Sequence, residues 1–86
     1  MNKLTLENIN AKIKSETYTR LPSGKVLICE LTLENGFSVL GEASVVDVNN
    51  YNEAIGKQIS REKAVSNIWL VEGYLLQEKL YTQGNK

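Results

Sequence analysis

Two glutamates stand beside the most strand-like stretch of the chain, where a close carboxylate pair would suggest acid–base chemistry. Glu30 precedes LTLENGFSVLGE (residues 31–42), and Glu42 ends it. The Asn-Gly pair at 35–36 predicts a two-residue hairpin turn, which pairs Glu30 with Gly41 and puts the two acids on opposite sheet faces. They cannot then act as a close pair. We interpret Glu30 as structural and Glu42, beside a glycine that permits close backbone approach, as a candidate ligand contact.

Two pairs of side chains have the types and spacing to hold a nucleotide. Lys57 and Arg61 are four residues apart on a predicted helix, so both can face one phosphate or carboxylate. Tyr18 and Arg20 lie on a presumed edge strand, where the ring can stack on a base and the guanidinium can grip a phosphate. The alternative for Lys57 and Arg61 is that they lie on a solvated helix face, because Glu53 precedes Lys57 by four residues and can pair with it.

Catalytic motifs are poorly represented. Ser60 and Lys63 match Ser-x-x-Lys, but the companion motifs of serine β-lactamases are absent, so we attribute the match to chance. The chain has no histidine and one cysteine, Cys29, which argues against a zinc site and against the commonest general base. We therefore expect no enzyme, no metal and no cofactor. A weaker possibility is a phosphodiesterase that uses Glu30, Glu42 or Asp47 with a divalent ion.

The balance of charged residues limits the classes of partner that the protein can attract. The 86 residues carry 10 basic and 10 acidic side chains, so no overall field attracts DNA, RNA or an anionic membrane. No apolar run approaches the roughly 20 residues that span a bilayer, and MNKLTLENINAK lacks the apolar core of a signal peptide. We expect a soluble, intracellular protein with no membrane partner.

The hydrophobic pattern predicts one α+β domain over residues 1–86. Leu-Pro-Ser-Gly at 21–24 supplies a turn, and the alternating stretch KVLICELTLE is the strongest strand. The pattern therefore predicts a three-stranded antiparallel meander between two helices. The expected elements are a short helix at 5–14, antiparallel strands within 16–46, a long helix at 51–81 and a frayed tail at 82–86.

The last helix is the feature that most suggests an oligomer. It is either continuous or broken near Gly56 or Gly73, and about 30 residues would span about 45 Å, more than a chain of this size needs. Neither face of the predicted hairpin is purely polar, so we expect a second subunit or a ligand on one of them. The sequence thus predicts a homo-oligomer, with four candidate interface residues: Leu40, Trp69, Tyr74 and Leu76.

Three stretches carry a family resemblance: CELTLENGFSVLGEAS, NYNEAIG and ISREKAVSNIWLVEGYLLQEKL. Together they resemble a family of small proteins from tailed bacteriophages and prophages, named for gene 66 of a Shigella phage and gene 49 of a coliphage. The resemblance covers roughly residues 9–81. The positions of Val48 and Val71 are often proline in that family, so we expect a looser turn after the sheet and no kink in the last helix. The resemblance implies an origin more than a mechanism.

A phage origin favours a counter-defence role. Our leading hypothesis is a non-catalytic homo-oligomer in the host cytoplasm that sequesters a small anionic ligand such as a cyclic nucleotide signal. The candidate contacts are Tyr18, Arg20, Glu42, Lys57 and Arg61. The alternative is a protein-interaction module that inhibits or redirects a host protein through the exposed face of residues 31–42.

Overall fold

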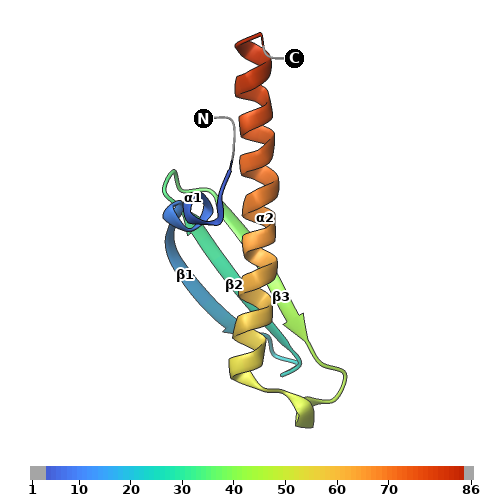
Figure 1. Cartoon of the computed structure of the whole chain (residues 1–86). Helices are drawn as coiled ribbons and strands as arrows, with labels where there is room; N and C mark the ends of the chain where they lie inside the picture. The colour runs from blue at the N-terminus through green and yellow to red at the C-terminus, as the bar shows by residue number, and fades with distance from the viewer. Residues whose placement is uncertain (1–3, 85–86) are drawn as a thin grey trace.

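A long helix crosses one face of a three-stranded antiparallel sheet in the computed structural model, which describes residues 4–84 (Figure 1). The predicted α+β fold is confirmed, and the sheet has the order β1-β2-β3 of a meander. The elements in chain order are α1 (Leu6–Ala11), β1 (Ile13–Arg20), β2 (Val26–Leu33), β3 (Ser38–Ser44), the 3-10 turn η1 (Val48–Asn50) and α2 (Glu53–Thr82).

Helix α1 is shorter than the predicted 5–14 because β1 already begins at Ile13. Thr5 caps it: its Oγ1 accepts a hydrogen bond from Asn8 N at 3.1 Å. Asn8 Oδ1 accepts one from Thr5 N in return, also at 3.1 Å. This reciprocal cap satisfies two backbone donors at the helix start. Within α1 only Ile9 is buried, so one side chain anchors the helix to the core.

The predicted turn at 21–24 is confirmed. Gly24 N donates to Leu21 O at 2.9 Å, and Leu21 N donates to Val26 O at 2.8 Å. Pro22 occupies the position whose φ its ring fixes, and Gly24 takes a φ of +76 that a side chain would disfavour. The β1–β2 connection therefore follows directly from local sequence.

The hairpin between β2 and β3 closes through three residues, 34–36, and the predicted two-residue turn is wrong. Leu33 N donates to Phe37 O at 2.7 Å, and Gly36 N donates to Leu33 O at 2.9 Å. A type I′ turn needs positive φ at both central residues, but here Gly36 has a φ of +93 while Asn35 does not have a positive φ. The Asn35 side chain instead accepts a hydrogen bond from Phe37 N at 3.0 Å.

This loop shifts the register by one residue and corrects the predicted faces. Glu30 pairs with Leu40, and Glu42 pairs with Ile28. Residues opposite each other share a face, so Glu30 and Glu42 lie on the same face rather than on opposite ones. That face, which we call the outer face, points away from the core. The core-facing row of β3 comprises Val39, Gly41 and Ala43, whereas Ser38, Leu40, Glu42 and Ser44 are exposed.

Helix α2 is continuous, so the alternative with a break near Gly56 or Gly73 is wrong. Asn52 caps its start by accepting a hydrogen bond from Ile55 N at 3.1 Å. The thirty-residue helix sets the elongated shape of the molecule, which measures 54 by 21 by 20 Å. Its end runs past the sheet (Figure 1).

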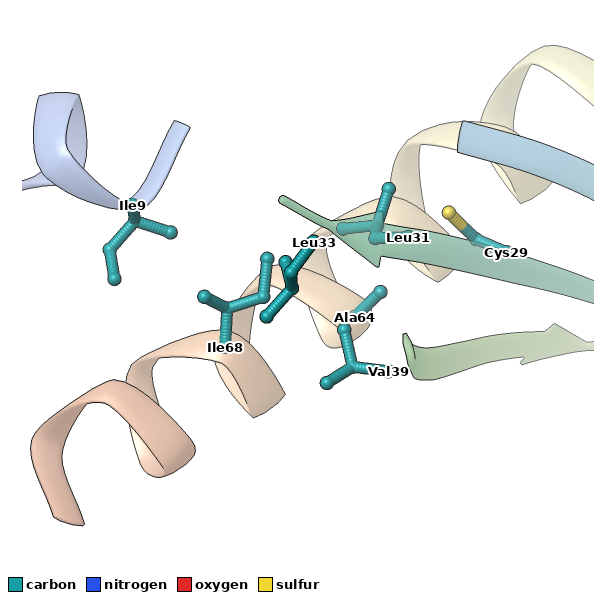
Figure 2. Close-up of a cluster of buried hydrophobic side chains, with 7 residues drawn as sticks. All are labelled: Ile9, Cys29, Leu31, Leu33, Val39, Ala64 and Ile68. Carbon is teal, nitrogen blue, oxygen red and sulfur yellow. The ribbon is translucent and has the colours of Figure 1, made fainter. Parts of the chain in front are cut away.

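The core forms where α2 and α1 meet the sheet (Figure 2). Leu31 and Cys29 of β2 are fully buried, as are Ile9 of α1 and Ile68 of α2. Burial raises the pKa of the Cys29 thiol, which keeps it in its protonated, unreactive form. The core cluster comprises Ile9, Cys29, Leu31, Leu33, Val39, Ala64 and Ile68.

Small residues bring α2 unusually close to β3. The buried row of the helix has a four-residue spacing: Gly56, Ser60, Ala64 and Ile68. A β-carbon on Gly41 would overlap the Ser60 carbonyl oxygen and the Ala64 amide nitrogen, so the helix backbone lies directly on this glycine. The sequence predicted a close backbone approach here, and the approaching chain is the protein's own last helix.

Asn67 of α2 also reaches the edge of the sheet. Its Nδ2 donates to Leu40 O at 2.6 Å. Alternate residues of β3 bond β2, as Leu33 N to Phe37 O shows, so the Leu40 carbonyl points away from β2 toward the open edge. The side chain thus satisfies a backbone acceptor that has no strand neighbour.

Candidate functional site

Four of the five predicted ligand contacts come together along one side of the molecule. Tyr18 pairs with Cys29 and Arg20 with Leu27, so their side chains share the sheet face that α2 covers. Lys57 Nζ lies 5.4 Å from the centroid of the Tyr18 ring. We call this surface the β1–α2 flank, and its members are Glu16, Tyr18, Arg20, Tyr51, Lys57 and Arg61.

Glu16 links the two elements of the β1–α2 flank. Its Oε1 accepts a hydrogen bond from Arg61 Nε at 3.1 Å, and its Oε2 accepts one from the Tyr18 hydroxyl at 2.8 Å. The Tyr18 hydroxyl, helped by the Arg61 guanidinium, holds the pKa of Glu16 below its usual value. Burial and the bond to Glu16 raise the pKa of Tyr18 far above its usual value, so this phenol stays neutral. The flank therefore presents a fixed phenol beside two cationic side chains.

Arg20 is held in place by the chain that precedes α2. Its guanidinium carbon lies 3.7 Å from the centroid of the Tyr51 ring, and its Nε and Nη2 donate to Gly24 O at 3.2 and 2.9 Å. The predicted alternative for Lys57 is also present, since its Nζ lies 3.4 Å from Glu53 Oε2. The flank thus contains three cations, two of which are partly neutralised by Glu16 within the flank and by Glu53 beside it.

Sequence reasoning did not find Glu16 or Tyr51. The ion pair of Glu16 with Arg61 joins residues 45 positions apart, and no local pattern predicts such a contact. Tyr51 was noticed only as the start of the predicted helix. The one available signal for Glu16 was its spacing of two from Tyr18, which places both side chains on the same face of a strand.

Glu16→Gln is expected to lower the free energy of unfolding by less than about 1 kcal/mol at pH 7, because the pair is half exposed. The lowered pKa of Glu16 in the folded state means that its contribution is present above the usual value of 4.5 and is lost as the pH falls through the folded value. Urea unfolding from about pH 7 to pH 3 should show the two proteins converging at low pH.

A matched control for this pH series is Glu30→Gln. Glu30 is exposed on the outer face and has no ion-pair partner among residues 4–84. Its substitution removes one carboxylate without breaking the Glu16 network, so comparison with Glu16→Gln isolates the effect of that network. A constant difference between the wild type and Glu16→Gln at every pH would contradict the assigned network.

Tyr51→Phe is expected to leave stability unchanged or to raise it by up to about 1 kcal/mol. The Tyr51 hydroxyl is buried and has no hydrogen-bond partner within the described part of the chain. Removing it abolishes a desolvated polar group while keeping the ring under Arg20. Urea unfolding followed by the fluorescence of the single tryptophan measures the change. A loss of more than about 1 kcal/mol would mean that the hydroxyl is hydrogen-bonded in solution.

The fifth predicted contact, Glu42, lies elsewhere. It projects from the outer face, beside a groove of about 460 Å³ that Leu40, Lys63 and Asn67 also line. Asp47 is engaged in capping η1, where its Oδ1 accepts a hydrogen bond from Asn49 N at 2.9 Å. Within residues 4–84 no three acidic, histidine or cysteine side chains cluster closely enough to hold a metal ion.

The predicted interface residues occupy two different surfaces. Leu40 is exposed on the outer face of the sheet, whereas Trp69, Tyr74 and Leu76 lie on the second half of α2. Tyr74 is 71% exposed, and Leu76 is partly buried.

None of the helices in the described residues is long and apolar enough to cross a membrane.

One protein family matches most of this chain. The model of the phage protein family described as N4 Gp49/phage Sf6 gene 66 matches residues 4–80. The chain belongs to this family. No curated protein and no solved structure gives a match.

The N4 Gp49/phage Sf6 gene 66 match covers every strand and almost all of α2, and it includes all the candidate residues described above. The resemblance seen in the sequence is therefore confirmed, and the protein is a phage protein. Two positions that are often proline in this family are valine here. Val48 is the first residue of η1, and Val71 lies within the continuous helix α2.

Proposed function

We propose that this phage protein captures a small anionic ligand, such as a cyclic nucleotide, and holds it without converting it. The observation that supports this most is the β1–α2 flank. It gathers two guanidinium groups, an ammonium group and a neutral phenol from segments far apart in the chain. Phosphate oxygens suit the guanidinium and ammonium donors, and a base can stack on a tyrosine ring.

The contacts of Arg61 and Lys57 leave both side chains able to bind a phosphate group. Arg61 uses its Nε on Glu16, which leaves the terminal nitrogens of the guanidinium for a phosphate. Lys57 is bound to an exposed glutamate by a single contact of 3.4 Å, a kind of pair that contributes little in water. A phosphate can therefore bind Arg61 beside Glu16, and it can displace Glu53 from Lys57 at a small cost in free energy.

The biological setting supports capture rather than turnover. The protein belongs to a phage family, which supports a role during infection, and we propose that it acts in the host cytoplasm as a counter-defence factor. The chain has no histidine to serve as a general base. We further propose a homo-oligomer, in which Leu40, Trp69, Tyr74 and Leu76 contribute to subunit contacts.

Isothermal titration with a panel of cyclic mononucleotides and cyclic dinucleotides tests this function. The double variant Lys57→Gln/Arg61→Gln should weaken binding at least about tenfold, because both phosphate donors lose their charge. Lys63→Gln is the matched control, since Lys63 lies on the β3 side of the same helix. Heating the complex should release intact nucleotide. An altered nucleotide would indicate an enzyme, and the absence of uptake by the wild type would overturn the proposal.

A second candidate is a protein-interaction module directed at a host protein. Large apolar side chains are exposed at the hairpin tip and on α2, including Phe37, Leu70 and Tyr74. Phe37 lies beside Val71 and Leu75, so the tip and the helix form one continuous surface. Pull-down from a host lysate should retain one protein in stoichiometric amount, and Phe37→Ser with Tyr74→Ser should abolish its retention. Retention that survives both changes would exclude this surface.

A further inference from the structure

The last eleven residues of α2, 72–82, begin beside the hairpin tip and continue beyond the sheet, and we call this segment the overhang. The hairpin tip reaches α2 at Val71, Glu72 and Leu75, so later residues have no strand beneath them (Figure 1). The overhang nevertheless carries leucine and tyrosine on several sides, and Tyr74 and Tyr81 are more than half exposed. Large apolar side chains gathered on an exposed helix indicate a surface that another molecule covers.

One side of the overhang borders a groove of about 420 Å³. Leu75 and Leu76 line it from α2, and Leu4 and α1 also line it. Two lysines and two glutamates also line the groove: Lys12, Glu34, Glu72 and Lys79. The salt bridges found among residues 4–84 involve none of these four, so the groove holds equal numbers of unpaired positive and negative charges.

The order of these residues along α2 is self-complementary. Glu72 precedes Leu75 by three residues, and Lys79 follows Leu76 by three. Seven residues are close to two helical turns, so Glu72 and Lys79 lie on the same face, with the two leucines between them. When an identical helix runs antiparallel across a two-fold axis at the leucines, each Glu72 meets the other chain's Lys79.

We propose that a second copy of this chain packs in this groove, with the two overhangs antiparallel about a two-fold axis between Leu75 and Leu76. Such a contact is isologous, so each favourable charge pair forms twice. The leucines of both chains bury each other at the centre of the contact. This inference specifies the oligomer within the proposed function, but it needs no ligand and can be tested without one.

Charge exchange provides the test. Sedimentation velocity without nucleotide should give the wild type a mass of twice 9.6 kDa at about 100 μM. Glu72→Lys and Lys79→Glu should each weaken association at least about tenfold, because each places two like-charge contacts at the interface. The double variant Glu72→Lys/Lys79→Glu should restore it. Glu78→Lys, on another side of the same overhang, is the control and should remain dimeric.

Disulfide trapping tests the axis without changing any charge. Leu76→Cys should cross-link two chains on oxidation, since this residue lies beside the axis, whereas Gln77→Cys should not. The native Cys29 is fully buried and does not compete. A monomeric wild type, single reversals without effect, a charge exchange that fails to restore association, or equal cross-linking at both positions would overturn the proposal. Because no nucleotide is present, none of these results bears on ligand capture.

Discussion

Gly41→Ala is expected to lower the free energy of unfolding by more than about 3 kcal/mol, a large part of the roughly 5–15 kcal/mol that stabilises a typical domain. The added methyl group would overlap the Ser60 carbonyl and the Ala64 amide of α2. Both obstacles are helix backbone, so no side-chain rotation can relieve the overlap. The helix would have to lift from the sheet and lose contacts with the core. Far-ultraviolet circular dichroism and urea unfolding measure the loss.

Gly73→Ala is the matched control for this substitution. It has no neighbour within 4 Å of an added β-carbon and lies in the interior of α2. Alanine has the higher helix propensity, so this change should stabilise the protein by about 0.5–1 kcal/mol. A Gly41→Ala protein as stable as the wild type would contradict the close packing of α2 on β3.

Ile68→Ala is expected to cost about 2–5 kcal/mol, the second largest effect. Ile68 is the largest fully buried side chain of α2, and it contacts the cluster that also contains Ile9 of α1 (Figure 2). Truncation removes apolar contacts and leaves a cavity where both helices meet the sheet. The urea midpoint should fall accordingly, while the slope of the transition stays unchanged.

Leu70→Ala controls for the loss of a large apolar residue from the same helix. Leu70 is 72% exposed, so its truncation should cost less than about 1 kcal/mol. Equal losses at positions 68 and 70 would mean that α2 is rotated relative to the orientation described here. A further loss of association in Leu70→Ala would place this residue in a subunit contact.

Local sequence predicted the elements of this fold better than their register. Pro22 and Gly24 specify a turn through fixed and positive φ angles, and Thr5 and Asn52 cap the helices that follow them. The hairpin tip depended instead on whether one or two residues took positive φ. That difference changes the local energy only slightly. It nevertheless moves every residue of β3 to the sheet face opposite the predicted one.

The candidate site was predicted in part for a related reason. Lys57 and Arg61 share a helix face through their spacing, so their proximity needed no tertiary information. Their position beside Tyr18 depends on how α2 crosses the sheet, which Gly41 and the small residues of the helix decide. Glu42 was assigned from its place beside Gly41, and the register puts its side chain on the outer face, away from Lys57 and Arg61.

Through the bond from Asn67 to the Leu40 carbonyl, α2 contacts the open edge of β3 as well as the core. An open strand edge can template pairing with another chain and so begin aggregation. Because Asn67 lies on the helix that also covers the core, one movement of α2 would expose the edge of β3 and the buried cluster together. We therefore expect a partly unfolded species in which α2 has left the sheet to aggregate more readily than the folded protein.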